Sequence, residues 1–354
     1  MNSITSTKYH VSTMMPSAPK NIFVGNFGQN TSVNGQVVKT KYVYAMLSDL
    51  MVLETLDVSS WARIFKTLFF VGRSNFYVLL GKKGIVLFCL LSIFSFRVRQ
   101  RTFHFILVGG WFPEYLAGSR LNTFLFSRLK YRATFYCESA AMCQQLEKLG
   151  FSGKYFPNFR NLNSIPLKGR QGENLKLVFL SRVTKDKGVF DAIALAKKLA
   201  LSRPCTLDIY GPGEQQTISR LEMEIHDLDN IQYSGVINPE KIQTILADYD
   251  FLIFPTRYPG ECMPGVLVEA FSVGLPVLTT DWRFMQEYVD HDETGYVIST
   301  QNFVENAAGK LVAMTDDDLQ ALRKNAIHKY EQFYSSKVAS QYFRTAFGAT
   351  TEQP

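Results

Sequence analysis

Cysteine is sparse in this chain and never closely spaced. The five cysteines form no CxxC pair and no Cys/His frame that could hold zinc: Cys89, Cys137, Cys143, Cys205 and Cys262. A scattered, odd-numbered set argues against a disulfide-stapled scaffold and fits a reducing compartment. Apolar residues make up 46% of the sequence, as in a globular protein, and 354 residues suit two domains of ordinary size.

Long hydrophobic runs are also missing. No segment reaches the roughly 20 apolar residues that span a bilayer, and residues 1–19, expected to be a flexible tail, lack the apolar stretch of a signal peptide. The chain is therefore expected to be cytoplasmic. A shorter apolar run at 85–96 fits two environments: a helix buried against a sheet, or a helix lying on an anionic membrane surface. Five basic residues frame this run: Lys82, Lys83, Arg97, Arg99 and Arg101.

Acidic residues are scarce in the first half of the chain. Residues 1–160 hold 19 Lys and Arg against 6 Asp and Glu, whereas the remainder holds 19 against 25. The basic half is expected to meet an anionic headgroup or a phosphate-bearing acceptor. Nucleic acid is not an expected partner, because there is no compact basic helix and no aromatic RNP-like motif.

What the sequence does contain is an alternation of short apolar runs with helical spacing. A first series predicts strands near 22–25, 101–110 and 133–139, and helices near 61–72 and 84–96. A second series begins at 175–183 and predicts further strands near 205–213, 231–235, 251–256, 276–280 and 294–299. Such alternation indicates parallel sheets with right-handed crossovers. The expected fold class is α/β, with two Rossmann-like domains at 20–160 and 161–330.

The window 251–281 contains two glutamates eight residues apart, Glu261 and Glu269, on either side of a helix start expected near 263–265. The free N–H groups and the dipole of a helix start form an anion site. Flanking carboxylates could then bind hydroxyls on either side of a diphosphate. The spacing alone fits equally well a Glu261 that caps the helix and a solvated Glu269.

A second window places two cations after a predicted strand. Arg182 and Lys187 follow the strand at 175–183, where two cations could neutralise a diphosphate, although a solvated basic loop explains them as well.

A third window contains two glycines. Gly28 and Gly35 lie between the first strand and the first helix, where backbone approaches ligands closely. They do not form a GxGxxG fingerprint, so a nicotinamide dehydrogenase is not expected.

The segments SRVTKDKG, ECMPGVLVE and EAFSVGLPVLTTD with TGYVI resemble, in order and spacing, the family-four retaining glycosyltransferases of the GT-B fold. They span most of residues 175–300. At the front, SVNGQVVKT and FILVGGWFPEYL resemble members that build bacterial capsule and O-antigen polysaccharides. The resemblance implies two domains that face each other across a cleft. It also implies a C-terminal segment, 331–354, whose helix crosses back before a short tail.

The resemblance also implies roles for individual residues. Arg182 and Lys187 would bind the donor diphosphate, and Glu261 the hydroxyls of the donor sugar; these three are the expected catalytic set. The other expected donor-binding residues are Gly35 in the first domain, Glu269 at the ribose, and Tyr210, Gly211, Val236, Met263, Pro264, Gly265, Val266 and Leu267 around the base and phosphates.

Transfer would then proceed with retention, from a UDP- or GDP-linked sugar to a saccharide or polyprenyl-diphosphate-linked acceptor at the inner face of the membrane. No cofactor and no metal are expected. There is no Asp-x-Asp at a strand end, and Asp316–Asp318 is interpreted as a helix cap or solvated loop. Two alternatives stay open: a non-catalytic nucleotide-sugar-binding partner subunit, and a nucleotide-sugar epimerase of the same fold.

One departure concerns a histidine that many members of this family carry in the first domain, after a central strand. Gly109, Gly110 and Trp111 occupy that region here, and no histidine follows. His104 lies within the preceding strand and is expected to be packed rather than catalytic.

Overall fold

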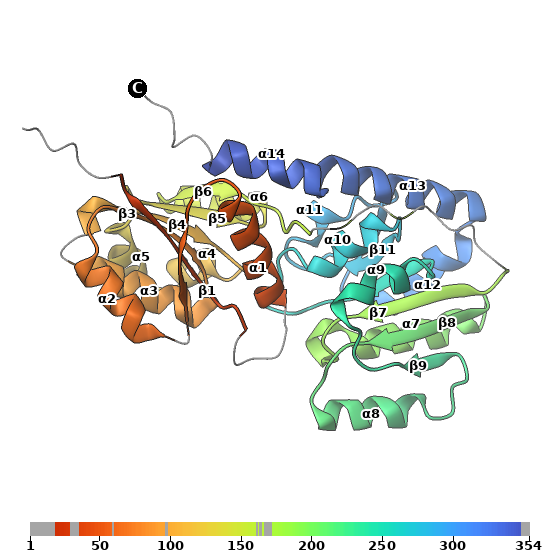
Figure 1. Ribbon diagram of the computed structural model, residues 1–354. Helices are drawn as coiled ribbons and strands as arrows, with labels where there is room; N and C mark the ends of the chain where they lie inside the picture. The colour runs from red at the N-terminus through yellow and green to blue at the C-terminus, as the bar shows by residue number, and fades with distance from the viewer. Residues whose placement is uncertain are drawn as a thin grey trace, which may run out of the picture.

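The computed structural model of the chain describes residues 18–28, 35–58, 60–95, 98–160, 162, 165 and 172–347. Within these residues two parallel sheets, each flanked by helices, form two domains side by side (Figure 1). The α/β class with two Rossmann-like domains is therefore confirmed. Most of the tail expected at 1–19, and the tail beyond 347, lie outside the described residues.

The first sheet is built from β1 (Lys20–Gly25), β2 (Glu54–Asp57), β3 (Ser74–Leu79), β4 (Arg101–Ile106), β5 (Ala133–Cys137) and β6 (Ser152–Tyr155). Its strand order is β2-β1-β3-β4-β5-β6, with every pair parallel. The sequence pattern missed β2, β3 and β6. Strands β2 and β6 have four residues each, too few to show a period, and β3 lies between the two helices expected near 61–72 and 84–96, in a stretch rich in apolar and aromatic residues.

The helices of the first domain are α1 (Gly35–Ser48), α2 (Trp61–Phe70), α3 (Lys82–Phe94), η1 (Val98–Gln100), α4 (Phe112–Ala117), α5 (Arg120–Ser127) and α6 (Ala140–Lys148). Helix α3 buries Ile85, Phe88 and Cys89 in the domain core and leaves Leu87 and Phe94 exposed. Among the described residues, none of the helices combines the length and apolarity needed to cross a bilayer.

Arg101 corrects the expected basic frame around the run at 85–96. The residue is fully buried rather than available to a headgroup. Its guanidinium donates to Ser95 Oγ at 2.8 Å and to the Val71 carbonyl at 2.6 Å, so it ties α2 and α3 to the start of β4. Arg97 lies outside the described residues.

The second sheet is built from β7 (Leu175–Leu180), β8 (Cys205–Tyr210), β9 (Ile231–Tyr233), β10 (Phe251–Phe254), β11 (Val277–Thr280) and β12 (Gly295–Ile298). All six were expected, and their order is β12-β11-β10-β7-β8-β9. The accompanying helices are η2 (Lys185–Lys187), α7 (Val189–Ala200), α8 (Gln215–Ile225), η3 (Pro239–Lys241), α9 (Ile242–Leu246), α10 (Gly265–Ser272), α11 (Met285–Tyr288) and α12 (Phe303–Ala313).

Two terminal helices run along one side of both domains: α13 (Asp316–Phe333) and α14 (Ser336–Phe347) (Figure 1). Asp318 forms a capping box with Thr315, so Asp316–Asp318 is a helix start, as expected. Helix α13 packs on α10, whereas α14 packs on α1 and places Phe343 and Phe347 in the core of the first domain. The last described helix therefore packs on the first domain.

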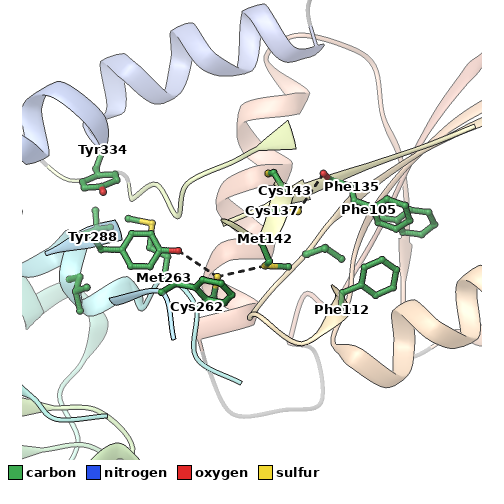
Figure 2. Close-up of a cluster of buried hydrophobic side chains, with 14 of the residues drawn as sticks. Phe105, Phe112, Phe135, Cys137, Met142, Cys143, Cys262, Met263, Tyr288 and Tyr334 are labelled. Atoms are coloured by element: carbon green, nitrogen blue, oxygen red, sulfur yellow. Dashed lines mark hydrogen bonds between the residues drawn. The ribbon is translucent and has the colours of Figure 1, made fainter. Parts of the chain in front are cut away.

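The two sheets share an apolar cluster across the domain boundary (Figure 2). Cys262 of the second domain lies at its centre, with its Sγ 3.9 Å from Met142 Sδ of the first domain and 3.5 Å from the Tyr288 hydroxyl. All three side chains are buried. Apolar contact of this kind holds the carboxyl edges of the two sheets toward each other.

Candidate functional site

A cleft of about 870 Å³ separates the two domains, and residues that follow strand ends form both of its walls. In each sheet the chain order reverses beside the first strand, between β1 and β3 and between β7 and β10. Ligands of open α/β sheets bind at the carboxyl ends of the strands at such a reversal. The lining residues follow β3 (Gly81, Lys82), β4 (Val108, Gly109), β5 (Glu138), β7 (Arg182, Lys187) and β10 (Tyr258–Met263).

Lys187 and Glu261 form a buried ion pair in the wall of the second domain. Lys187 Nζ lies 2.5 Å from Glu261 Oε2, and both side chains are less than 10% exposed. The hydroxyl of Thr256 donates to the same carboxylate oxygen at 2.8 Å. The turn that delivers Lys187 requires Gly188, whose φ is +82° and whose added Cβ would lie 2.2 Å from the Pro255 carbonyl oxygen. The structure thus joins two residues that lie far apart in the sequence.

Arg182 stands beside this pair and lines the same cleft. Its guanidinium lies 5.2 Å from the centre of the Tyr258 ring, and Lys187 Nζ lies 4.7 Å from the same ring. Among the described residues Arg182 has no carboxylate partner. An exposed cation is therefore left facing the cleft, while Tyr258 holds the two cations close together.

Helix α10 begins at Gly265, within the expected range, and its start faces the cleft. Both simple alternatives for the glutamates are wrong. The N-cap is Pro264, with no side-chain cap, so Glu261 does not cap the helix. Glu269 is not a solvated residue, because its side chain is 16% exposed and pairs with Arg160 at 3.3 Å. Glu269 does not line the cleft itself, but its partner Arg160 does.

Other expected donor residues gather at one edge of the second sheet. Tyr210 pairs with Leu180, two residues before Arg182, and the Gly211 amide donates to the Gly235 carbonyl at 2.8 Å, next to Val236. Gly211 must be glycine, because its φ is +136° and an added Cβ would lie 1.7 Å from the Ser181 carbonyl oxygen. This group does not line the cleft itself, and Val236 is 69% exposed.

At the start of α10 the expected residues divide between the cleft and the core. Met263 and Gly265 line the cleft, whereas Pro264, Val266 and Leu267 do not. Leu267 is fully buried and its amide donates to the Pro264 carbonyl at 3.2 Å. A phosphate at Leu267 would have to share or displace that hydrogen bond.

In the first domain, Gly35 is the first residue of α1 and lines the cleft. Among the described residues, a Cβ added to Gly35 would meet nothing within 4 Å. The close approach of backbone to a ligand that was expected between Gly28 and Gly35 falls on residues 29–34, which lie outside the described residues.

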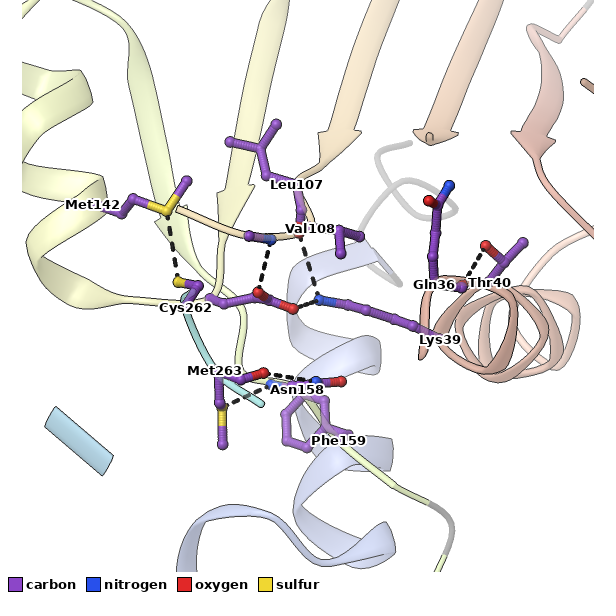
Figure 3. A network of polar contacts seen from close by, with 12 residues as sticks. Gln36, Lys39, Thr40, Leu107, Val108, Met142, Asn158, Phe159, Cys262 and Met263 are labelled. Carbon is purple, nitrogen blue, oxygen red and sulfur yellow. Dashed lines mark hydrogen bonds and ion pairs between the residues drawn. The ribbon is translucent and has the colours of Figure 1, made fainter. Parts of the chain in front are cut away.

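The first wall also carries an ion pair that the sequence analysis missed (Figure 3). Lys39 of α1 pairs with Glu138 at the end of β5, and both side chains are less than 5% exposed. The second carboxylate oxygen of Glu138 accepts from the Gly109 amide at 3.1 Å, and Lys39 Nζ lies 3.5 Å from the Leu107 carbonyl oxygen. A lysine within a helix and a glutamate before a helix cap gave no signal in the sequence. The pair lines the cleft beside Gly109, in the region where the sequence has no histidine.

His104 is packed, as expected. Its ring stacks on Tyr77 with the ring centres 4.7 Å apart, and its Nδ1 lies 3.2 Å from the Tyr136 hydroxyl. Burial, with a smaller effect of the Lys154 charge, lowers the pKa of His104 to about 4. The imidazole is therefore neutral at physiological pH.

The segment between the domains supplies Asn158 and Arg160, which line the cleft and had been interpreted as the end of the first domain. The Asn158 amide group donates to the Met263 carbonyl at 2.9 Å. On the other side, Glu287 accepts from Ser139 Oγ at 2.7 Å and from the Ala140 amide at 2.8 Å. These contacts fix the two walls relative to each other.

No group of three or more His, Cys, Asp or Glu side chains suited to a metal ion occurs in the part of the chain that the structure describes. Of the carboxylates that line the cleft, Glu114, Glu138 and Glu261 are in ion pairs and Asp186 is exposed, whereas Arg182 faces the cleft as a cation. Such a lining suits an anionic ligand with several phosphate oxygens.

Residues 164–332 match the family model of the glycosyl transferases group 1. Over 177 residues the chain is 27% identical to N-acetyl-alpha-D-glucosaminyl L-malate synthase of Bacillus anthracis. Over 176 residues it is 26% identical to the putative colanic acid biosynthesis glycosyltransferase WcaL of Escherichia coli K12. Each alignment covers 47% of this chain and 43% of the relative, so the chain matches less than half the length of either.

A solved structure covers almost the whole chain. Anabaena Alr3699/HepE, in complex with UDP and glucose, superposes with a TM-score of 0.68 at 15% identity, over 94% of this chain and 100% of that protein. At this identity the likeness shows the fold. The chain thus has the GT-B fold that the resemblance implied.

Proposed function

We propose that this chain, whose residues 164–332 form a glycosyl transferases group 1 domain within a GT-B fold, transfers a sugar from a nucleotide-sugar donor to a saccharide acceptor in surface polysaccharide synthesis. The observation that carries the proposal is the meeting of Arg182, Lys187 and Glu261 with the start of α10 in one interdomain cleft. A uridine diphosphate donor is favoured, because UDP and glucose occupy the structural relative.

In this proposal the cations bind the diphosphate of the donor and the glutamate binds its sugar. Arg182, Lys187 and the first amides of α10 stabilise the negative charge that develops on the leaving diphosphate. Lys187 has three N–H donors, so it can bind a phosphate while it still holds Glu261. Glu261 in turn accepts from hydroxyls of the donor sugar and fixes its orientation.

We propose that transfer proceeds with retention and without a metal. The sugar–phosphate bond breaks with oxocarbenium character, and the acceptor hydroxyl attacks from the face that the diphosphate leaves. The departing phosphate takes the hydroxyl proton. Cations and helix amides then do for the leaving group what a divalent metal would do elsewhere.

Glu261→Ala tests the assignment in a transfer assay with a panel of nucleotide-sugars and saccharide acceptors. Turnover should fall by about 100-fold or more, because an interaction with the transition state is lost. Glu293→Ala, at an exposed site of the same domain, is the control. A wild-type chain that binds a donor but transfers no sugar would support a binding subunit. A free isomer formed from nucleotide-sugar alone would support an epimerase.

We further propose that the acceptor is lipid-linked and that the first domain meets an anionic membrane. Helices α2 and α3 end in Phe70 and Phe94, which are 75% and 72% exposed, and the first 160 residues carry an excess of Lys and Arg over Asp and Glu. Exposed aromatic side chains on a basic domain suit an anionic headgroup layer. Sedimentation with anionic liposomes at low salt should show binding that Phe70→Ser/Phe94→Ser weakens. Equal recovery of both proteins in the supernatant would exclude this contact.

A further inference from the structure

Arg160 lies in the segment between the domains and is almost completely buried, with 7% of its surface exposed. Its Nη1 donates to Asn158 Oδ1 at 2.6 Å and to the Phe159 carbonyl at 3.1 Å. Its Nε donates to Glu269 Oε1 at 3.3 Å. Three fixed contacts therefore determine the direction in which the guanidinium plane points.

The remaining nitrogen, Nη2, is placed against the first residue of α10. A Cβ added to Gly265 would lie 1.8 Å from Arg160 Nη2, so the guanidinium occupies the space that any side chain at this position would need. Both residues line the interdomain cleft. Within the described parts of the chain, Nη2 has no hydrogen-bond partner.

The guanidinium is buried except where it reaches the cleft. Nη2 is not one of the buried side-chain atoms that lack a partner in the described residues, so its open edge faces the cleft. A purely structural link between Asn158 and Glu269 would not need the free edge to face the cleft. The free edge, beside the amides at the start of α10, matches the needs of a phosphate oxygen.

Arg182 and Lys187 reach the cleft from a different part of the fold than Arg160 does. Arg182 and Lys187 follow β7, whereas Arg160 comes from the interdomain segment and meets the helix start at Gly265. Lys187 and Arg160 are each held by a glutamate, Glu261 and Glu269. An anion bound at the start of α10 would therefore be bracketed by cations of separate origin.

We propose that Arg160 is a third cation for the donor diphosphate, oriented by Glu269 and Asn158. The proposal rests on the proposed function and adds a residue to that site. It gives Glu269 a second role, because its carboxylate holds Arg160 in the direction of the phosphates. It also makes donor binding depend on the segment that joins the two domains.

The test compares Arg160→Met with the wild type in calorimetric titrations with a nucleoside diphosphate and the matching nucleoside. The nucleoside diphosphate used is whichever of UDP, GDP, ADP and dTDP the wild-type protein binds most tightly. One lost charge-assisted hydrogen bond should weaken diphosphate binding roughly 10- to 100-fold. Binding of the nucleoside should change less than about threefold, because no phosphate is present.

Two further variants separate contact with the ligand from support of the fold. Arg160→Lys keeps the charge but loses the planar guanidinium, so its loss of diphosphate affinity should lie between those of the wild type and Arg160→Met. This variant replaces Arg160→Met in the test if Arg160→Met does not fold. Arg203→Met is the matched control, because Arg203 binds the Leu311 and Met314 carbonyls away from the cleft. Equal weakening of diphosphate and nucleoside in the Arg160 variants would overturn the proposal, since a structural support affects both alike.

Failure of the proposed function would look different. In that case the wild type would bind none of the four nucleoside diphosphates. If the wild type binds one of them and Arg160→Met and Arg160→Lys bind it equally well, Arg160 is not part of the site, and the proposed function stands without it.

Discussion

At the scale of single residues, the walls of the cleft share one device, a lysine and a glutamate buried as an ion pair. Lys187 pairs with Glu261 in the second domain, and Lys39 pairs with Glu138 in the first. Buried pairs contribute little to stability compared with well-packed apolar side chains. Their presence in both walls of one cleft is therefore better explained by ligand binding than by stability.

Lys187→Met should reduce both stability and transfer. Glu261 would be left buried with the Thr256 hydroxyl as its remaining contact among the described residues, which should lower the free energy of unfolding by about 3 kcal/mol. Lys187→Met/Glu261→Gln should recover most of that stability but none of the transfer. Urea unfolding and the transfer assay measure the two effects. A Lys187→Met protein as stable as the wild type would contradict the expected cost.

His104 should make the protein less stable in acid. The folded state holds its pKa at about 4, below the ordinary value of 6.5. Between these values the unfolded chain binds a proton that the folded chain does not, so the free energy of unfolding should fall as pH drops from 6.5 toward 4. The decrease should reach at most about 3 kcal/mol.

His104→Phe should remove that part of the pH dependence, because a phenyl ring can stack on Tyr77 without titrating. Urea unfolding between pH 4.5 and 7.5 measures it. His226→Gln serves as the control, since His226 is 81% exposed. If the free energy of unfolding of His104→Phe falls at low pH as much as that of the wild type, groups other than His104 cause the decrease.

At the scale of elements, two helices that begin at the cleft begin with glycine. Gly35 starts α1 in the first domain, and Gly265 starts α10 in the second. The two glycines serve different needs in this structure. A Cβ at Gly265 would overlap Arg160, whereas a Cβ at Gly35, which lines the cleft, would meet nothing within 4 Å in the described part of the chain.

Gly35→Ala should therefore change donor binding without changing stability. The fold accommodates the methyl group, so the free energy of unfolding should stay within about 0.5 kcal/mol. If the donor passes close to α1, kcat/KM should fall by about tenfold or more. Gly309→Ala is the matched control: its Cβ also meets nothing within 4 Å, but it lies in α12. Wild-type kinetics in Gly35→Ala would place the donor away from α1.

At the scale of the whole molecule, the domains are held together by polar contacts on top of the shared apolar cluster. Glu287 of α11 binds amides at the start of α6, and Arg283 donates to the Gly110 carbonyl at 2.8 Å. The Tyr288 hydroxyl donates to the Glu138 carbonyl at 3.0 Å. Residues 283–288 of the second domain thus contact the first domain at three places: after β4, after β5 and at the start of α6.

Glu287→Ala should loosen this domain contact while each sheet stays folded. The amides of Ala140 and Ala141 would lose their acceptor, so hydrogen exchange should accelerate around 139–142 and 285–288. We expect kcat/KM to fall about tenfold, because the two walls would no longer be fixed relative to each other. Glu293→Ala is the control. Unchanged exchange at 139–142 would show that the apolar cluster alone holds the domains.

The sequence by itself determined the α/β class, all six strands of the second sheet and the start of α10. Apolar runs and helical spacing are local patterns, so they survive without knowledge of the fold. The motif windows also identified Arg182, Lys187 and Glu261, which the fold brings into one cleft. Short strands such as β2 and β6 carried too few residues for a period.

Only the tertiary structure decided which charges meet. Lys39 and Glu138 lie on separate elements of the first domain, and Arg160 reaches Glu269 and Gly265 from the segment between the domains. Sequence spacing carries no information about such pairs, because contact across crossovers depends on strand order and on how the two sheets face each other. The same reason explains why neither simple alternative for Glu261 and Glu269 held: their partners come from other parts of the chain.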